Sequence, residues 1–272
     1  MIIRKSPQEI DRMRRAGRLV GHTLTVVSEA AEPGVSLFEL DKLAERTIRA
    51  AGAIPSFLGY HGFPATLCLS PNDVVVHGIP SGYVLREGDI LSIDCGAIVE
   101  AYHGDAAVTV PIGRVDEAAM RLIATTERAM WAGIAQVRAG NRLSDIGHAV
   151  EQVAAVGGYG VVREYVGHGI GTAMHEEPQV PNYGRPGRGI RLDVGLALAI
   201  EPMLNEGGPD TGVLDDGWTV VTRDGRRSAH FEHTVAITAA GPEVLTLLDG
   251  ASQEEWLMPT PESDWPAGAG SR

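Results

Sequence analysis

Four stretches of the chain carry apolar residues at helical spacing, two near its start and two in its middle. The first two begin at capping sequences, Ser6-Pro7-Gln8-Glu9 and Ser36-Leu37-Phe38-Glu39, in which a glutamate follows a serine cap after three positions. Breaks at Pro33-Gly34, Gly52 and Gly157-Gly158 mark helix ends. The pattern predicts helices that begin at Ser6, Ser36, Ala118 and Leu143.

Apolar and alternating runs follow each pair of predicted helices and are typical of strands. In the first half they are Ala65–Leu69, Val74–His77, Asp89–Val99 and Ala101–Val110. In the second half they are Val161–Tyr165, Ala197–Met203, Trp218–Thr222 and Ala229–Thr238. Runs of this kind favour antiparallel pairing with helices on one face of the sheet. The sequence therefore predicts an α+β fold.

The order helix, helix, strands occurs twice, and parts of the two copies resemble each other in sequence. Leu85–Asp94 aligns with Leu192–Glu201 without a gap, and His103-Gly104-Asp105 resembles His230-Phe231-Glu232. We therefore predict one catalytic domain over residues 1–258, formed by an internal duplication with halves of about 1–115 and 116–258. Residues 259–272 are expected to form a disordered tail, because their composition cannot bury enough apolar surface.

The duplicated stretches deliver two acidic residues from each half. Strand alternation places Asp94 on the face opposite to its apolar neighbours, where an unpaired carboxylate is costly to bury. Asp94 and Asp105 aimed at one point would repel each other unless a cation lay between them. The second half offers Glu201 and Glu232 at the matching positions. Four such carboxylates are enough to bind a pair of metal ions.

Histidines near these acids extend the candidate site. His168 lies in the glycine-rich stretch Gly167–Gly171, where backbone and ligand can approach closely, and is interpreted as a metal ligand. His175 lies too far along to serve as the same ligand, and Glu176 and Glu177 beside it are expected to be solvated. His77 is either a structural residue or a donor to a developing oxyanion or an amide nitrogen.

The donor types restrict the metal and the chemistry. Carboxylates with one imidazole suit manganese, iron, cobalt or zinc and exclude metals that prefer thiolates. Two such ions can polarise a carbonyl group and activate water, which is hydrolase chemistry. Other chemistries lack support in the sequence. It has no G-x-S-x-G motif and no phosphate-binding loop. An H-E-x-x-H zinc motif would need histidine at position 179, where the chain has glutamine.

Composition narrows the class of protein further. The 272 residues are 44% hydrophobic and 21% charged, as in ordinary soluble domains, and the net charge of −12 argues against a nucleic-acid partner. No apolar run approaches the ~20 residues that span a bilayer, so no membrane association is expected. Cys68 and Cys95 lie in apolar runs and are interpreted as reduced thiols, which predicts a cytoplasmic location.

An ordered set of motifs resembles type I methionine aminopeptidase from about Ser6 to Thr246. The motifs include Y-H-G-F-P, V-H-G-I-P, I-D-C-G, Y-H-G-D, G-H-G-I-G, H-E-E-P, A-I-E-P-M and F-E-H-T. The resemblance implies the pita-bread fold, with two pseudo-symmetric halves around two divalent metal ions. It also implies removal of the initiator methionine from nascent polypeptides whose second residue is small. We expect a monomer, and transient association with the ribosome.

The resemblance assigns roles residue by residue. The implied metal ligands are Asp94, Asp105, His168, Glu201 and Glu232. The implied catalytic residues are His77, His175 and Glu201, with Glu201 passing a proton to the leaving nitrogen after hydroxide held between the metals attacks the carbonyl. The implied substrate contacts are Tyr60, Phe63, Cys68, His77, His175 and Trp218.

Three positions depart from the usual pattern of this family. Met174 stands where phenylalanine is frequent, and Gly96 where threonine is frequent. His230 stands where glutamine is common and is expected to add a titratable group near the metals. These changes bear on fine specificity and metal preference, and none removes a ligand. Two alternatives stay open: an X-prolyl aminopeptidase, prolidase or creatinase with the same fold, or a binding module without catalysis.

Overall fold

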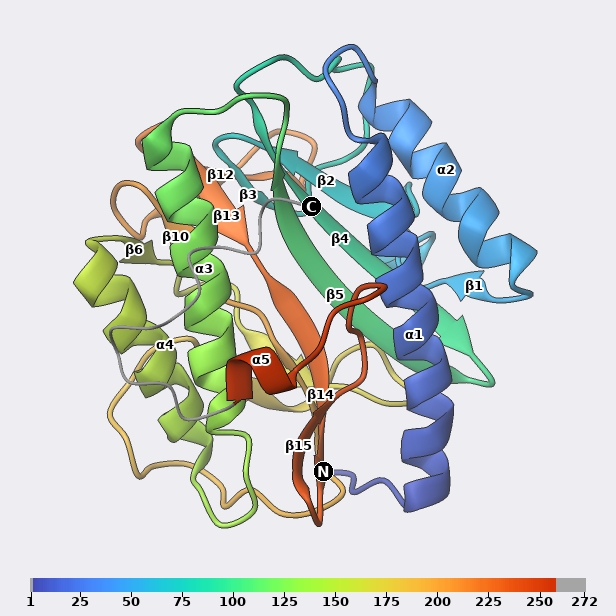
Figure 1. The fold of residues 1–272 in the computed structure, drawn as a ribbon, viewed down its shortest axis with the longest axis vertical. Coiled ribbons are helices and arrows are strands. Elements are labelled where there is room, and N and C mark those ends of the chain that lie inside the picture. The colour runs from blue at the N-terminus through green and yellow to red at the C-terminus, as the bar shows by residue number, and fades with distance from the viewer. Residues whose placement is uncertain (1, 258–272) are drawn as a thin grey trace.

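Four long helices lie on one face of a curved antiparallel sheet in the computed structural model of the chain, which describes residues 2–257 (Figure 1). The helices are α1 Pro7–Ala30, α2 Leu37–Ala50, α3 Glu117–Ala135 and α4 Leu143–Gly157. All four predicted helices are present. Ser6 and Ser36 are the N-caps of α1 and α2, and each forms the full capping box with the glutamate three positions on. No helix within residues 2–257 has both the length and the apolar character needed to cross a membrane.

The main sheet has nine strands in the order β1-β4-β5-β14-β9-β7-β8, with β2 added beside β4 and β15 beside β14. Its strands are β1 Ile54–Pro55, β2 Leu67–Pro71, β4 Ile90–Val99, β5 Tyr102–Pro111, β7 Gly167–Gly169, β8 Glu176–Val180, β9 Ala197–Ile200, β14 Glu232–Thr238 and β15 Gly241–Val244. The long β4–β5 hairpin pairs continuously from Ile90–Pro111 to Val99–Tyr102. β5 and β14 therefore meet at the centre of the sheet.

Two smaller sheets and two short helices complete the described residues. Their elements are β3 Val74–Val76, β6 Gly160–Val161, β10 Met203–Asn205, β11 Thr211–Val213, β12 Val220–Thr222, β13 Ser228–His230, the 3-10 turn Tyr60–Gly62 and α5 Glu254–Leu257. The two smaller sheets have the strand orders β13-β10-β6 and β11-β12-β3. The predicted tail over 259–272 lies outside the described residues.

Two predicted strands are each divided in the structure. Ala197–Met203 becomes β9 and β10, with Glu201 and Pro202 between them, because proline has no N–H to continue the ladder. Ala229–Thr238 becomes β13 and β14, which separate at Phe231. In both cases the first and second parts pair in different sheets. The division leaves Glu201 just beyond a strand end.

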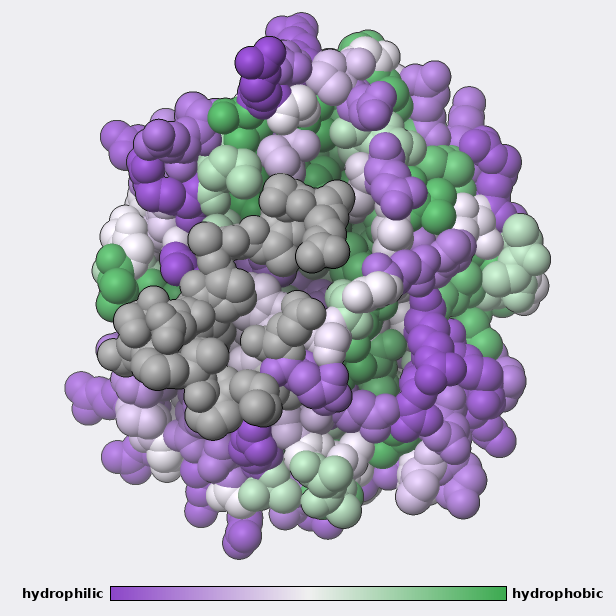
Figure 2. All heavy atoms as spheres, viewed as in Figure 1, coloured by the Kyte–Doolittle hydropathy of each residue, from purple (hydrophilic) through white to green (hydrophobic). Residues whose placement is uncertain are grey.

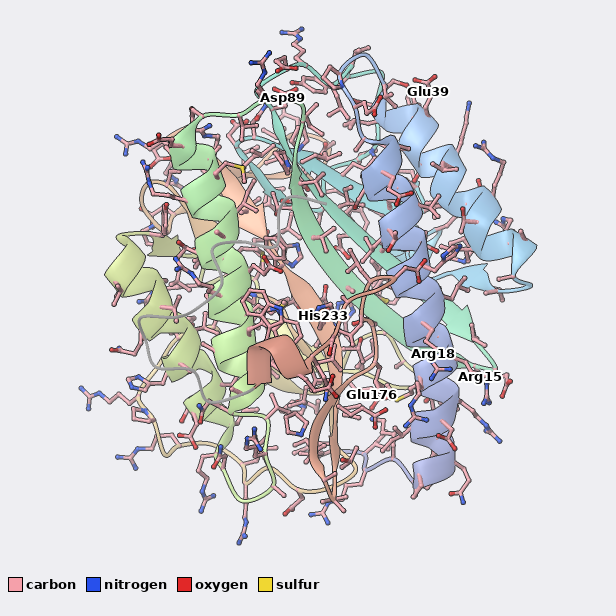
Figure 3. All side chains as sticks on the ribbon, viewed as in Figure 1. Arg15, Arg18, Glu39, Asp89, Glu176 and His233 are labelled. Carbon is pink, nitrogen blue, oxygen red and sulfur yellow. The ribbon has the colours of Figure 1, made fainter. Side chains whose placement is uncertain are left out.

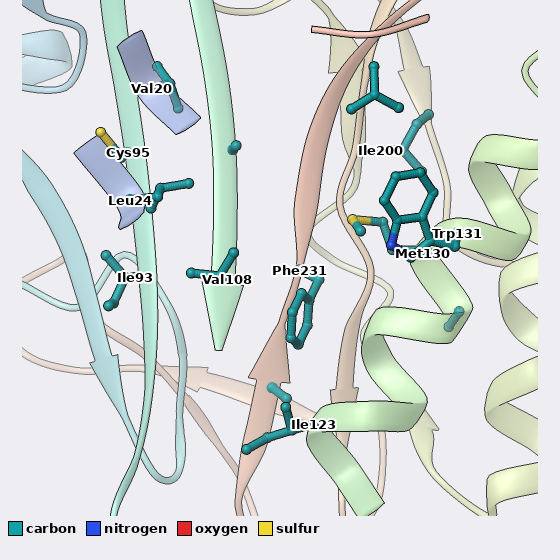
Figure 4. Packing of buried hydrophobic residues seen from close by; sticks show 14 of the residues in the cluster. Val20, Leu24, Ile93, Cys95, Val108, Ile123, Met130, Trp131, Ile200 and Phe231 are labelled. Atoms are coloured by element: carbon teal, nitrogen blue, oxygen red, sulfur yellow. The ribbon is translucent and has the colours of Figure 1, made fainter. Parts of the chain in front are cut away.

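The core lies between the helices and the sheet. Figure 4 shows Val20 and Leu24 facing Ile93 on the α1 side, and Ile123 and Trp131 of α3 near Phe231 on the other. The predicted apolar face of β4 is fully buried there, while Asp94 on its opposite face is 8% exposed. Towards solvent, the helix-bearing face shows mostly hydrophilic side chains with apolar patches between them (Figure 2).

Close backbone contact holds α1 against the rest of the molecule. A Cβ atom on Gly17 would lie 2.2 Å from the carbonyl oxygen of Leu245, and one on Gly21 would lie 2.0 Å from that of Leu247. On the sheet side, a Cβ on Gly104 would lie 2.8 Å from the backbone nitrogen of Gly17. Glycine at these positions lets the helix touch both β5 and the 245–247 segment.

We therefore expect Gly21→Ala to destabilise the protein, although alanine is the better helix former by about 1 kcal/mol. Overpacking of this contact should lower the free energy of unfolding by about 1–3 kcal/mol in urea denaturation. Gly212→Ala is the control, because nothing lies within 4 Å of a Cβ there. An equal or greater stability for Gly21→Ala would show that α1 does not pack as closely as the structure indicates.

Candidate metal centre and substrate pocket

Five adjacent strands bring the five predicted metal ligands together. Asp94 lies on β4, Asp105 on β5, Glu232 at the start of β14, Glu201 just after β9, and His168 on β7. Asp94 and Glu232 both stand opposite Ala107 of β5, and Asp105 is two residues before Ala107. Since side chains two residues apart share a face, the three carboxylates point to the same side of the sheet.

The distances show a tight cluster. Asp105, His168 and Glu232 each offer a ligand atom within 4.8 Å of the other two. His168 Nε2 lies 3.8 Å from Asp105 Oδ2 and 3.5 Å from Glu201 Oε1. His168 Nδ1 lies 2.8 Å from the carbonyl oxygen of Gly169 and donates to it, which leaves Nε2 without a proton. Burial lowers the pKa of His168 to about 3, so its imidazole is neutral.

The carboxylates are held together against their mutual repulsion. Burial raises the pKa of Asp94 to about 7, and burial with neighbouring carboxylates raises the pKa of Asp105, Glu201 and Glu232 well above the ordinary values. Within residues 2–257, no lysine or arginine forms an ion pair with any of the four. One buried oxygen on each of Asp94, Asp105 and Glu232 has no hydrogen-bond partner.

These observations fit bound divalent cations. Unpartnered carboxylate oxygens and an unprotonated imidazole nitrogen are the donors that manganese, iron, cobalt and zinc accept. A cation would also remove the repulsion that raises the pKa values of these acids. The residues present therefore suit a metal centre, whereas the number and identity of the ions do not follow from the donor set.

A cavity of about 480 Å³ opens beside this cluster. Its lining includes every residue that the sequence analysis placed in the site: Tyr60, Phe63, Cys68, His77, Asp94, Asp105, His168, His175, Glu201, Trp218 and Glu232. The structure thus brings all of them to one place, while their individual roles stay predictions. The sequence analysis missed other lining residues, among them Phe57, Glu164, Tyr165 and Gln179.

One end of the cavity is apolar. Phe57, Phe63, Cys68 and Met174 belong to one buried cluster, and Trp218 packs against it with its ring 5.2 Å from that of Phe63. This composition suits an unbranched apolar side chain with a polarisable sulfur atom. The cavity therefore has an apolar end next to a strongly acidic one.

The glycine at position 96 belongs to the packing of this apolar end. A Cβ atom on Gly96 would lie 2.8 Å from Cβ of Ser56 and 2.9 Å from Cε1 of Phe57. The Phe57 ring thus occupies space that a larger residue at position 96 would need. The only signal for Phe57 in the sequence was its closeness to the Y-H-G-F-P motif.

Besides His168, the predicted site histidines His77 and His175 both line the cavity. His175 Nδ1 is 2.7 Å from the Tyr60 hydroxyl, and its ring is 4.3 Å from that of His168. His77 follows β3 with a φ of 59°, and its ring contacts those of Tyr165 and Trp218 edge-on, at 5.5 and 6.3 Å. Burial lowers the pKa of His77 to about 4, so this imidazole is neutral too.

The structure corrects the interpretation of two other residues. Glu176, expected to be solvated, has a side chain only 5% exposed and paired with Lys5, whereas Glu177 is exposed. His230, the departure from the family pattern that was expected to act as a titratable group near the metals, is buried at 1% exposure. Burial lowers the pKa of His230 to about 3, which keeps it neutral.

Comparison with known proteins agrees with this geometry. Metallopeptidase family M24 matches residues 11–239 of the chain. Methionine aminopeptidase of Clostridium perfringens is 52% identical over 248 residues, which cover 91% of this chain and 100% of that protein. The structure of methionine aminopeptidase from Rickettsia prowazekii has a TM-score of 0.90 at 42% identity and covers 91% of this chain and 100% of that one.

A more distant structure shares the fold alone. The prolidase from Pyrococcus furiosus has a TM-score of 0.75 at 21% identity, and covers 91% of this chain and 66% of that one. The matches confirm both the pita-bread fold and the resemblance that the ordered motifs indicated. The chain belongs to metallopeptidase family M24, on the branch formed by the methionine aminopeptidases.

Proposed function

We propose that this protein is an aminopeptidase that removes methionine from the N-terminus of polypeptides whose second residue is small. The observation that carries the proposal is one cavity in which an apolar end adjoins four converging carboxylates and a neutral histidine. The naming of its relatives as methionine aminopeptidases supports the same conclusion. Nascent polypeptides are the proposed substrates, and transient ribosome association stays a prediction.

The proposed metal ligands are Asp94, Asp105, His168, Glu201 and Glu232, and we propose two divalent ions. Asp105 and Glu232, from the two strands at the centre of the sheet, would hold the ions together with the three ligands beside them. When bound, such ions would supply Lewis-acid activation of the scissile carbonyl and of the attacking water.

Glu201 is the proposed proton carrier. Its carboxyl lies beside His168 and lines the cavity. A carboxylate in this position can take a proton from the attacking water and then pass it to the leaving amide nitrogen. Neutral His77 stands at the same cavity and is proposed to assist at that nitrogen.

His175 is proposed to stabilise negative charge on the carbonyl oxygen. When the Tyr60 hydroxyl donates to His175 Nδ1, the proton of the neutral imidazole resides on Nε2. Nε2–H is then the group that can donate to the oxygen as it gains charge. Phe57, Phe63, Cys68 and Met174 would meanwhile hold the methionine side chain and exclude water.

The direct test is a peptide assay on metal-stripped protein restored in turn with manganese, iron, cobalt or zinc. Met-Ala-Ser should lose its methionine at least ~10-fold faster than Ala-Pro-Ala loses its alanine, because the apolar end of the cavity fits methionine. The opposite preference would instead support the X-prolyl alternative. Failure of every metal to restore cleavage of either peptide would favour a binding module.

Asp94→Asn and Glu232→Gln should each reduce turnover to near background while the folded structure is kept. Each change removes a charge from the metal site but retains the size of the side chain. Turnover of Met-Ala-Ser and metal content per chain are the measurements, with circular dichroism to check folding. Glu117→Gln is the control, since that side chain is 95% exposed. A near-normal rate for either variant would remove the residue from the metal site.

His175→Ala should lower kcat by ~10² to 10³, the loss typical of an oxyanion donor. KM for Met-Ala-Ser should change little if the contact forms mainly in the transition state. His148→Ala is the matched control, because His148 lies on α4 with its Nδ1 against the Gly184 carbonyl oxygen. A defect confined to KM would show that His175 binds substrate without stabilising charge.

In metal-free protein, Asp94 should make a pH-dependent contribution to the free energy of unfolding. Because burial raises its pKa from 3.8 to about 7, the folded state binds this proton more tightly than the unfolded chain does. The associated stability is complete below about pH 3.8 and is lost as the pH rises through about 7. Buried neutral histidines such as His168 act in the opposite direction, so a comparison with Asp94→Asn is needed.

In urea denaturation with EDTA, the free energy of unfolding of the wild-type protein, relative to that of Asp94→Asn, should therefore decrease from pH 5 to pH 7.5. Added divalent metal should abolish that decrease, because a cation stabilises the charged form. A relative stability that rose over this range would show that the folded Asp94 is not forced toward its protonated form.

A further inference from the structure

The hairpin formed by β7, residues 170–175 and β8 carries both histidines of the acidic end. His168 lies in β7, and His175 immediately precedes β8. Gly169 stands opposite Glu176 in the pairing of the two strands, and the register shifts between His168 and Gly169. The position of one side of this hairpin therefore sets the separation of the two imidazoles, whose rings are 4.3 Å apart.

A buried ion pair anchors this hairpin to the start of the chain. Glu176 Oε2 accepts from the ammonium group of Lys5, and the two side chains are only 5% and 3% exposed. Glu176 Oε1 also accepts from the backbone N–H of Ala173, inside the turn. Lys5 donates a second bond, of 3.2 Å, to the carbonyl oxygen of Ile3. Figure 3 labels Glu176 in the lower part of the view, which is also where α1 begins.

Lys5 is itself held in place by a backbone hydrogen bond and by the start of α1. Its backbone N–H donates to the carbonyl oxygen of Gly195 at 2.7 Å. The next residue, Ser6, is the N-cap of α1, and Glu9 of that capping box accepts from the Tyr102 hydroxyl at 2.8 Å. The ammonium group therefore approaches Glu176 from a segment fixed to both the helix layer and the sheet.

The pair also packs closely against the turn. A Cβ atom on Gly171 would lie 2.5 Å from Glu176 Oε1 and 2.6 Å from Lys5 Cε. The carbonyl oxygen of Gly171 accepts from the backbone N–H of His103, at 2.8 Å. A displacement of the Lys5 and Glu176 side chains would therefore be transmitted directly to the backbone of the turn.

We propose that Lys5 and Glu176 are positioning residues for His175, an inference that rests on the proposed function of that histidine. Neither side chain lines the cavity, so neither contacts the substrate. Removal of one partner leaves the other charge buried and unpaired, a strongly destabilising state that favours displacement of the hairpin. Misplacement of a catalytic group by about 1 Å can reduce a rate by ~10².

Lys5→Met is the main test, because it leaves the Glu176 carboxylate unpaired without changing a residue that lines the cavity. We expect kcat for Met-Ala-Ser to fall ~10-fold or more, with KM within ~3-fold of the original value. Glu176→Gln, which keeps the size of the side chain, should act in the same direction and serves as the test should Lys5→Met fail to fold. Unchanged kcat in the folded variant would overturn the proposal.

Arg4→Met is the matched control, since Arg4 is adjacent in sequence and its ion pair with Asp193 is exposed, at 62% and 38%. It should leave kcat unchanged, because exposed pairs contribute little.

A second measurement separates positioning from a general loss of stability. In a His175→Ala background, Glu176→Gln should lower kcat by less than ~2-fold, because the group that it positions is already absent. A purely structural role would instead give the full additional loss, and that result would overturn the proposal.

Hydrogen exchange tests the anchoring without any reference to activity. Amide exchange in residues 170–176 should accelerate ~10-fold or more in Lys5→Met and in Glu176→Gln, but not in Arg4→Met. Unchanged exchange would overturn the proposal even if the original protein cleaves methionine. Conversely, original protein that releases no methionine would refute the proposed function, and the exchange result would still decide whether the pair holds the hairpin.

Discussion

Repulsion among four converging carboxylates is the constraint around which this structure is arranged. Asp94, Asp105, Glu201 and Glu232 converge where burial raises the pKa of each, and neighbouring carboxylates raise it further for the last three. Such an arrangement persists only if the backbone is held more strongly than the acids push it apart. The continuous β4–β5 ladder and the pairing of β14 with β9 supply that rigidity. A bound cation would then stabilise the charged form of these carboxyl groups, which burial in the protein alone disfavours.

The border between β5 and β14 shows how that backbone is held. Only two residue pairs of the regular ladder join these strands, Glu232 with Ala107 and His233 with Ala106. On one side of them, Thr234 Oγ1 accepts from the Asp105 N–H and donates to the Asp105 carbonyl oxygen. On the other side, Thr109 Oγ1 makes the same two bonds with the backbone of His230. Threonine side chains thus replace ladder bonds beside two of the acids.

The elements that sequence could predict are those fixed by local interactions. Both capping boxes involve residues three positions apart, and strand alternation alone places Asp94 opposite the apolar face. The convergence of the ligands was inferred from the repeated acid positions, and the sheet order brings those residues together. The strand order does not test the predicted division of the domain into halves of about 1–115 and 116–258.

What sequence could not predict depends on partners distant in the chain. Glu176 looked solvated because its partner, Lys5, is separated from it by most of the chain. The division of Ala197–Met203 follows from pairing in two different sheets, which an apolar run does not reveal. Phe57 could be assigned to the pocket only once its ring was seen to fill the space beside Gly96. Long-range packing decided each of these cases.

The carboxylates also determine the chemical character of the apolar end. Cys68 lines the cavity and stands directly opposite Asp94 in the pairing of β2 with β4. Burial, followed by the charges of Asp94 and Asp105, raises the pKa of this thiol well above its ordinary value. A neutral thiol is a poor metal ligand and a good apolar wall. Burial, with Asp94, Asp105 and Glu232 nearby, therefore keeps Cys68 protonated, so that metal binding and recognition of an apolar side chain can occupy neighbouring parts of one cavity.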